Sequence, residues 1–332
     1  MHTQNTNYNP FVSLIIPTKN EEKYIGKLLE SIINQSYPKD KFEILIFDGL
    51  SEDKTIEIVK KYKDKLNLRI FKNPKIKQVY AFNMGLEKAK GDYFIILGAH
   101  SYIEKSFIRK NIRTFLEMKE KEPRLAGVGG YHVNVYENYF GKIVALLLGS
   151  FFAGGSSYRY SKKSHFTNTV VFGLYDKKIV KDIGKFNEDF IIGQDFELNR
   201  RLNKKEYKLY FNPMIKSYYF VRSSFKKFLI QTFNYGVVKG LMVKNNYFDP
   251  RWSIPFIFLI YEILLFSKIF TSTFLFFPFV LYWVLAIGVS LRLLIKTKDT
   301  CCLFLPIMYF IFYNIVGIGF LSGLLFGKKM FR

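Results

Sequence analysis

Short apolar segments alternate with segments of helical periodicity through the first hundred residues, and this alternation constrains the fold more than any other feature. Apolar runs of strand length occupy residues 12–17, 42–48, 68–71 and 93–97. Segments with their apolar residues on one helical face lie between them, at residues 21–35, 54–63 and 78–90. Strand–helix–strand repeats of this length predict parallel strands joined by right-handed crossovers. We therefore expect an α/β domain with a Rossmann-like, mostly parallel sheet flanked by helices, up to about Lys208.

The loops after the strands are the first candidates for a binding site, because parallel sheets bind ligands at the carboxyl ends of their strands. The first strand ends in Pro17-Thr18-Lys19-Asn20-Glu21 and the second in Asp48-Gly49-Leu50-Ser51. Both loops open helices, so their backbone N–H groups are expected to be available to an anion. Ser51 and Asp53 are expected to cap the second helix. Asp48 follows its strand directly and can accept hydrogen bonds from a base or a ribose.

The fourth strand ends in Gly98-Ala99-His100, and we expect a basic helix to follow. This strand end carries a glycine and a histidine and no acidic residue. The sequence has neither a Gly-x-Gly-x-x-Gly motif nor a Walker loop, so a dinucleotide enzyme and a P-loop enzyme have no support.

The net charge of +23 admits three kinds of partner: nucleic acid, an anionic membrane surface and anionic substrates. Lysine and arginine are spread along the chain and no nucleic-acid-binding motif occurs, so we expect no nucleic acid partner. The two cysteines, Cys301 and Cys302, are adjacent, which excludes a disulfide framework and suits a reducing cytosol. The N-terminal MHTQNTNYNP lacks the apolar core of a signal peptide.

The composition changes after residue 250. Residues 269–291 and 301–326 contain no charged residue, and both runs exceed the roughly 20 residues that span a bilayer. Residues 253–267 are apolar apart from Glu262 and are expected either to span or to lie in the interface. Two to three transmembrane helices are thus expected. Their orientation stays open, because basic clusters flank the last span at both ends and cannot both obey the positive-inside rule. These clusters are Arg292, Lys296 and Lys298, and Lys328, Lys329 and Arg332.

Residues 220–246 interleave basic and aromatic side chains. This composition is typical of a helix that lies on an anionic membrane surface. The alternative is the basic, solvated face of an ordinary helix. Because apolar spans follow immediately, we favour the membrane surface.

Several motifs together resemble a known family. SLIIPTKNEEKYIGKLLESI, the pattern Asp48-Gly-x-Ser-x-Asp-x-Thr and KAKGDYFIIL resemble the inverting family-2 glycosyltransferases with the GT-A fold. GGSSYRY (154–160), FNEDFIIGQDFELNRRL (186–202) and YNIVGIGFLSGLLFG (313–327) are similar to the succinoglycan-biosynthesis, ExoA-type branch. The resemblance covers nearly the whole chain. It implies a GT-A catalytic domain at 1–219, a basic interfacial segment at 220–250 and a membrane domain at 251–332.

The resemblance implies a donor site at the strand ends. Pro17, Thr18 and Glu21 would line the nucleotide pocket, and Asp48 would hold the uracil or ribose of a UDP-sugar. The family usually carries Asp-x-Asp after the fourth strand, because a divalent cation there neutralises the diphosphate leaving group. Members of the ExoA-type branch carry a pattern similar to Asp-x-His at this point, and His100 matches its histidine as a metal ligand. Gly98 departs from both Asp-x-Asp and Asp-x-His. Mn²⁺ or Mg²⁺ is implied, at a weak or absent site.

The pair Gln194-Asp195 matches the Glu-Asp pair of the family, whose Asp is the general base. Inversion needs such a carboxylate, because the acceptor hydroxyl loses its proton as it attacks the anomeric carbon. The alternative is that Asp195 caps a helix at 196–203. Gln194 replaces the second carboxylate, and Glu197 with Arg201 is expected to be an ion pair on the helix surface.

The resemblance places His165, Asn168 and Thr169 near the acceptor. Arg159 could hold a phosphate with two hydrogen bonds, or it could brace its glycine-rich loop. The Gln-x-x-Arg-Trp element of processive members is replaced by Phe233-Asn234-Tyr235-Gly236, which favours single transfers over polymerisation. Lone His132 is assigned no role.

The resemblance and the residues together favour a membrane-anchored, inverting hexosyltransferase at the cytoplasmic face of the cell membrane. It would use a nucleotide-sugar donor, with UDP preferred, and a lipid-linked saccharide acceptor. The alternative is a degenerate domain that binds a nucleotide-sugar or glycan as a scaffold in a polysaccharide assembly complex. A small transporter is disfavoured, because the apolar spans are few and carry almost no polar residues.

Overall fold

The structure is a computed structural model, and it describes residues 9–153, 157–267 and 276–327. The first residues of the chain, residues 154–156 of GGSSYRY and the basic residues 328, 329 and 332 lie outside the described residues. The chain divides into two compact units. The sheet unit comprises Met1–Val133 and Ser161–Tyr219, and the helical unit comprises Asn134–Tyr160 and Phe220–Arg332. Asn134–Tyr160, which fall inside the expected domain of residues 1–219, are grouped with the helical unit.

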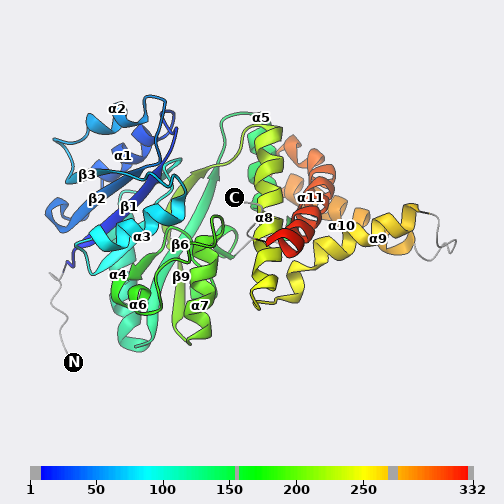
Figure 1. Cartoon of the computed structure of the whole chain (residues 1–332). Coiled ribbons are helices and arrows are strands. Elements are labelled where there is room, and N and C mark those ends of the chain that lie inside the picture. The colour runs from blue at the N-terminus through cyan, green and yellow to red at the C-terminus, as the bar shows by residue number, and fades with distance from the viewer. Residues whose placement is uncertain (1–8, 154–156, 268–275, 328–332) are drawn as a thin grey trace. The chain divides into compact units, whose positions relative to one another are not determined.

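The expected repeat of strands and helices is present at the start of the sheet unit (Figure 1). The strands are β1 (Val12–Thr18), β2 (Phe42–Asp48), β3 (Leu68–Lys72) and β4 (Tyr93–Ile96). The helices between them are α1 (Ile25–Ile33), α2 (Thr55–Lys60) and α3 (Gln78–Lys88). The strands pair in parallel in the order β3-β2-β1-β4. The predicted elements are confirmed, and each helix is shorter than its apolar pattern.

Beyond β4 the sheet continues with strands that the repeat did not predict. They are β5 (Ser101–Ile103), β6 (Leu125–Val135), β7 (His165–Thr167), β8 (Leu174–Asp176) and β9 (Lys208–Phe220). Within the described residues, the order continues from β4 as β8-β6-β9-β5, with β7 also paired to β9. The pairings of β8 with β4 and β6, and of β9 with β5 and β7, are antiparallel. The sheet is therefore mixed, and β5 stands between His100 and the expected basic helix.

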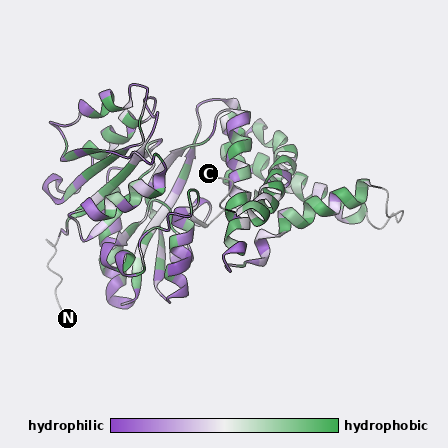
Figure 2. Ribbon diagram, in the orientation of Figure 1, coloured by the Kyte–Doolittle hydropathy of each residue, from purple (hydrophilic) through white to green (hydrophobic). Residues whose placement is uncertain are grey.

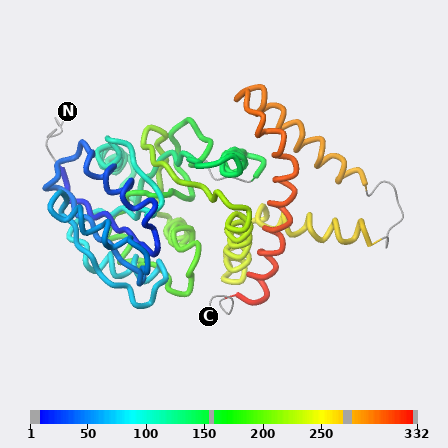
Figure 3. Tube along the Cα trace, turned by 90° about the horizontal axis from the view of Figure 1, so that it is seen from above, coloured from blue at the N-terminus to red at the C-terminus, as the bar shows by residue number. Residues whose placement is uncertain are grey.

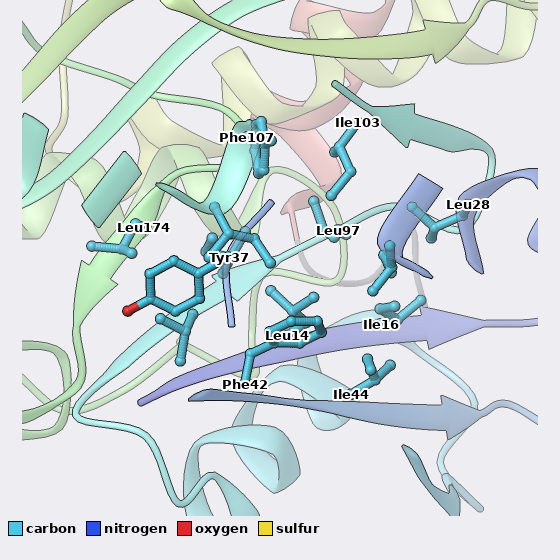
Figure 4. Close-up of a cluster of buried hydrophobic side chains, with 14 of the residues drawn as sticks. Leu14, Ile16, Leu28, Tyr37, Phe42, Ile44, Leu97, Ile103, Phe107 and Leu174 are labelled. Carbon is cyan, nitrogen blue, oxygen red and sulfur yellow. The ribbon is translucent and has the colours of Figure 1, made fainter. Parts of the chain in front are cut away.

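Helices cover both faces of the sheet because the strand residues alternate between them. Further helices of this unit are α4 (Phe107–Lys121), α6 (Lys177–Asp182) and α7 (Gln194–Lys204). Leu14 and Ile16 of β1 pack with Leu28 of α1 and Phe107 of α4 (Figure 4). Ile15, between them in sequence, packs on the other face with residues of α3 and α7. This core fixes the strand ends that carry the candidate site.

The helical unit contains α5 (Tyr139–Leu148), α8 (Phe225–Lys244), α9 (Ile254–Phe266), α10 (Phe277–Thr297) and α11 (Leu305–Phe326). Two of its segments, Phe277–Thr297 and Thr300–Phe326, are long and apolar enough to cross a membrane. Their hydrophobic character is visible in Figure 2. α9 is also apolar, but its 13 residues are fewer than a span requires.

Helix α8, which was expected to lie on a membrane surface, packs along α11 (Figures 1 and 3). Glycines on both helices form the contact: Gly236 and Gly240 of α8, and Gly319 and Gly323 of α11. A Cβ atom at any of these four positions would overlap the backbone of the other helix. Small residues spaced four apart allow helices to approach this closely. One face of α8 is therefore occupied by α11.

Candidate active site

The loops after β1 and β2 are interlocked by hydrogen bonds. The backbone N–H of Glu21 donates to Thr55 Oγ1 (2.7 Å), and that of Glu22 donates to Asp53 Oδ2 (3.1 Å). In return, the N–H of Lys54 donates to Glu22 Oε2 (3.0 Å). Asp53 also accepts the N–H of Thr55 at 3.0 Å, but the N-cap of α2 is Lys54 and no side chain caps this helix, so the prediction that Asp53 caps it is wrong. The N–H groups of Glu21, Glu22 and Lys54 therefore already have partners in the opposite loop and are not available to an anion.

Asp48 lies buried at the end of β2, opposite Thr18 of β1. Its Oδ1 accepts hydrogen bonds from the hydroxyl of Ser51 (2.6 Å) and from the N–H of Ser51 (3.2 Å). The prediction that Ser51 caps α2 is therefore wrong. Ser51 lies four residues before the first residue of α2, and its hydroxyl instead fixes the orientation of the Asp48 carboxylate.

Two buried acceptors beside Asp48 lack hydrogen-bond partners within the described residues, Thr18 Oγ1 and Asn73 Oδ1. The backbone N–H of Asn73 donates to the Asp48 carbonyl at 2.7 Å. Buried polar atoms rarely stay unpaired, because an unmade hydrogen bond costs roughly 1–3 kcal/mol. Thr18 and Asn73 are therefore candidate ligand contacts. Sequence reasoning missed Asn73, although a polar residue directly after the third strand was the available signal. Pro17 is buried within β1.

Glu21 and His100, both assigned to the donor site, are brought into contact. His100 Nδ1 lies 3.0 Å from Glu21 Oε1, and both side chains are largely buried. The ring of Tyr219, from β9, packs edge-on against the His100 imidazole, with centroids 5.0 Å apart. If Nδ1 carries the proton it donates to the carboxylate, which leaves Nε2 as the nitrogen available for other contacts.

An aromatic ring lies where an aspartate at position 98 would extend. A Cβ atom on Gly98 would be 3.1 Å from Cζ of Phe172. Phe172 has a positive φ of 46°, a backbone conformation that a bulky residue adopts only under constraint. Its ring packs against buried His132, whose Nδ1 lies 2.8 Å from Ser217 Oγ. His132, which was assigned no role, therefore supports the ring that covers Gly98.

The residues at this strand end do not fit a divalent cation. Gly98 contributes no side chain, and the Nδ1 of His100 is in contact with Glu21. No three His, Cys, Asp or Glu side chains come together as possible metal ligands anywhere in the described ranges. Mg²⁺ prefers six oxygen ligands, commonly including one or two carboxylates. The expectation that His100 helps to hold Mn²⁺ or Mg²⁺ finds no supporting ligand set.

Asp195 is the second residue of α7. The helix begins at Gln194, after Gly193 in the left-handed conformation, and Asp195 Oδ1 accepts the N–H of Phe196 at 2.8 Å. The alternative that Asp195 caps a helix beginning at 196 is therefore wrong. The residue keeps an exposed surface, yet the surrounding protein desolvates the carboxyl and raises its pKa, and the Phe196 bond offsets this only in part. A carboxylate with a raised pKa is suited to accept a proton.

Asn168 and Thr169 are tied to the helix of Asp195. Asn199 Nδ2 donates to Thr169 Oγ1 (3.0 Å), and Asn203 Nδ2 donates to the Asn168 carbonyl (3.0 Å). Buried Tyr175 donates to Asn199 Oδ1 at 2.9 Å. Burial raises the pKa of Tyr175, and the negative charge of Asp195 adds to this, so the two groups are neighbours.

The other predicted acceptor residues are held differently. Gln194 is buried, and its side-chain amide donates to the carbonyl of Ile191. Arg159 belongs to the helical unit, where its Nη1 donates to Asn134 Oδ1 at 2.6 Å and its guanidinium lies over the Tyr158 ring. These contacts agree with the bracing role that was the alternative for Arg159.

Glu197 and Arg201 form an ion pair, as expected, but not on the surface. The Arg201 guanidinium meets both Glu197 oxygens, at 2.7 and 2.9 Å, and Glu197 is only 1% exposed. Arg201 also donates to the carbonyl of Ile183 at 2.7 Å. The pair therefore anchors the segment before α7 to the helix that carries Asp195.

Comparison with known families gives two overlapping matches. The model of glycosyl transferase family 2 matches residues 13–184, and that of glycosyl transferase family group 2 matches residues 105–321. The chain is 47% identical over 327 residues to a Methanococcus voltae protein, dolichyl N-acetyl-alpha-D-glucosaminyl phosphate 3-beta-D-2,3-diacetamido-2,3-dideoxy-beta-D-glucuronosyltransferase. That match covers 97% of this chain and 99% of the relative.

Two further similarities are more distant. Glycosyltransferase AglE of Haloferax volcanii is 29% identical over 204 residues, which cover 61% of this chain and 64% of the relative. A mannosyltransferase of Pyrobaculum calidifontis, solved in complex with GDP-Man and Mn²⁺, superimposes with a TM-score of 0.61. The superposition covers 96% of this chain and 88% of that chain, at 18% identity, so it shows the fold alone.

Proposed function

We propose that this chain, which belongs to glycosyltransferase family 2, is an inverting hexosyltransferase. It has the GT-A-like fold. It would move a sugar from a nucleotide-sugar to a lipid-linked saccharide acceptor. The observation that carries the reaction type is the raised carboxyl pKa of Asp195, an exposed residue in the first turn of α7. The acceptor class is supported by the relative at 47% identity, which is named for a dolichyl-linked sugar phosphate.

In the proposed reaction Asp195 is the general base. Its carboxylate takes the proton of an acceptor hydroxyl while that oxygen forms a bond to the anomeric carbon of the donor. The bond from this carbon to the diphosphate oxygen breaks on the opposite face, and the nucleoside diphosphate leaves with the electron pair. The configuration at the anomeric carbon is thereby inverted. A positioned base contributes roughly 10²- to 10⁴-fold to such a step.

The proposed donor site lies at the ends of β1, β2 and β4. Asp48 and Glu21 would bind the nucleoside, with Pro17 and Thr18 beside them, and Gly98 and His100 would lie near the diphosphate. We propose a UDP-linked donor, although the structural neighbour at a TM-score of 0.61 carries GDP-Man. Members of the family commonly use a divalent cation. No step of this reaction is assigned to one here, because the groups around Gly98 and His100 do not fit it.

The proposed acceptor region contains Asn168, Thr169 and Gln194 of the sheet unit, whereas Arg159, which the resemblance also suggested, belongs to the helical unit. The division proposed from the sequence is a catalytic domain at 1–219, an interfacial segment at 220–250 and a membrane domain at 251–332. Two apolar segments support membrane association, and we place the catalytic domain at the cytoplasmic face of the cell membrane. Assignment to the succinoglycan ExoA-type branch also stays a proposal, which rests on the motifs at 154–160, 186–202 and 313–327.

The second candidate is a scaffold that binds a nucleotide-sugar or glycan without transferring it. It is favoured by one observation, the glycine and the Phe172 ring in place of the expected aspartate. A scaffold needs no base, so substitution of Asp195 should leave its binding and its function unchanged. The enzyme, in contrast, should keep donor binding and lose transfer.

The decisive experiment uses the full chain in detergent. A panel of UDP-, GDP- and dTDP-sugars is tested with a polyisoprenyl-phosphate-linked N-acetylglucosamine, and the anomeric configuration of the product is read by NMR. We expect one donor class to give an inverted product. Asp195→Asn should reduce turnover roughly 10²- to 10⁴-fold. The control is Asp182→Asn, an exposed aspartate at the end of α6, which should stay active. Full activity of Asp195→Asn would refute the assignment of the base.

A further inference from the structure

Three segments that are far apart in sequence meet at one end of the helical unit. They are the start of α5, the start of α8 and the turn between α10 and α11. Asn138 Nδ2, before α5, donates to the Ser223 carbonyl, before α8, at 2.9 Å. Lys142 of α5 forms an ion pair of 2.8 Å with Asp299 of the turn. We call residues 136–142, 222–227 and 292–304 together the basic collar.

Aromatic rings join the same segments and extend to the surface. The Phe140 ring lies 5.9 Å from that of Phe225, and the Tyr139 ring lies 6.1 Å from that of Phe304. Large apolar side chains of the collar remain about half exposed: Tyr136 46%, Tyr139 55%, Phe225 49%, Leu303 58% and Phe304 48%. Several exposed rings from three segments form a patch of a kind that soluble surfaces seldom show without a binding role.

The charges of the collar are almost all positive. Lys142 and Asp299 neutralise each other, and Glu137 is the remaining acidic residue of the three ranges. The exposed basic residues are Lys226, Lys227, Arg292, Lys296 and Lys298, with Arg222 partly exposed. Alternating basic and aromatic residues at the ends of apolar helices are typical of the membrane–water interface. Here α10 ends at Thr297 and α11 begins at Leu305, both beside the collar.

We propose that the basic collar binds the head groups of anionic lipids. The positive charge of the collar matches an anionic leaflet. The exposed rings suit the head-group level of a bilayer whose surface lies at the end of α10 and the start of α11. The proposal rests on the membrane association in the proposed function, but not on the transfer reaction. It extends the expected surface of 220–246 to α5 and to the turn before α11.

The far end of α8 contacts the far end of α11 and not the collar. Lys244, the last residue of α8, donates to the Leu325 carbonyl near the end of α11 at 3.0 Å. Gly236 and Gly240 face α11. The lipid-binding part of the basic segment is therefore its first part, which includes Phe225, and not its whole length.

The test compares two lipids on the full chain in neutral detergent micelles. Phosphatidylglycerol and phosphatidylcholine that carry the same fluorophore are titrated, and energy transfer from the protein gives their apparent affinities. We expect phosphatidylglycerol to bind more tightly, with a preference that falls as NaCl rises. Removal of collar lysines should weaken its binding roughly fivefold per lysine, the equivalent of about 1 kcal/mol each. The collar variant carries Lys226→Gln, Lys227→Gln, Lys296→Gln and Lys298→Gln.

The matched control removes the same charge from exposed lysines of the sheet unit. It carries Lys60→Gln, Lys61→Gln, Lys63→Gln and Lys65→Gln. We expect this control to keep the wild-type preference for phosphatidylglycerol. An equal loss in both variants, or equal affinity of the wild type for the two lipids, would overturn the proposal and leave the collar to a different acidic partner. Transfer activity in neutral detergent, measured on the same preparations, tests the proposed function separately.

Discussion

Substitution of Gly240 by alanine tests whether α8 is held against α11 as the structure shows. A Cβ atom at Gly240 would lie 2.7 Å from the backbone nitrogen of Leu324 and closer still to the carbonyl oxygen of Phe320. Ordinary contact begins at 3.4 Å, so the first gap alone is short by 0.7 Å. Both obstacles are backbone atoms, which cannot rotate away as a side chain can. The helices must therefore separate or slide along one another.

The expected change in the free energy of unfolding is the sum of two opposing effects. Overpacking of a well-packed contact costs roughly 1–3 kcal/mol, and alanine in place of glycine inside a helix gains about 1 kcal/mol. The matched control is Gly288→Ala in α10, where no described atom lies within 4 Å of the added Cβ. The control Gly288→Ala should therefore show only the gain in stability from alanine inside a helix. We expect the free energies of unfolding of the two variants to differ by about 1–3 kcal/mol, with Gly240→Ala the less stable.

The assay is unfolding of both variants in the same detergent, with increasing sodium dodecyl sulfate as denaturant and helicity from circular dichroism as readout. Gly236→Ala should resemble Gly240→Ala, because its Cβ would lie 2.7 Å from the Phe320 nitrogen. Equal stability of Gly240→Ala and Gly288→Ala would refute the close contact of α8 with α11.

Three further predictions concern the sheet unit. Because the surrounding protein desolvates the Asp195 carboxyl and raises its pKa, and the base must be ionised, kcat/KM should fall on acidification at a pH above the usual aspartate value of about 3.9. A pH profile with its acidic limb at or below that value would contradict the assignment. Gly98→Asp/Phe172→Ala should bind Mn²⁺ in isothermal titration where the wild type and Phe172→Ala do not, and failure of the double variant would exclude this strand end as a latent metal site. Arg201→Met leaves the Glu197 carboxylate buried and unpaired and should destabilise the protein by about 3–5 kcal/mol in urea unfolding, whereas the double variant with Glu197→Leu should recover most of the loss.

The sequence was sufficient for the parallel half of the sheet and insufficient for the rest. β1 to β4 are buried runs separated by helices of clear periodicity, so local pattern and topology agree. β6 includes three glycines, which lower its strand propensity. One of them, Gly130, leaves no room for a Cβ beside the backbone of Ile215 in β9. The glycine at this position is required by pairing with a strand far along the chain. The local pattern of apolar residues does not reveal this requirement.

The candidate site divides in the same way. The family resemblance assigned Glu21 and His100 to one donor site at the ends of the parallel strands, and these two side chains are in contact. The partner of Ser51 depends on the backbone turn after β2, which a capping rule cannot resolve. The position of the Phe172 ring over Gly98 depends on a left-handed residue 74 positions further along the chain. The sequence alone reveals that position 98 lacks a carboxylate, but it does not reveal that the Phe172 ring lies there.

The amino-acid composition of α8 shows its positive charge, but it does not show which face of the helix packs against a neighbour. The mixture of lysine and aromatic residues at 220–246 predicted a membrane surface, and composition does not reveal which face a neighbouring helix takes. The spacing of Gly236 and Gly240 in α8, and of Gly319 and Gly323 in α11, held that information. Since these glycines commit one face of α8 to α11, its basic residues can serve a membrane only from the other face and from its start. The charge of the whole segment therefore overstates the surface that we propose to bind lipid, which takes only the start of α8, together with α5 and the turn before α11.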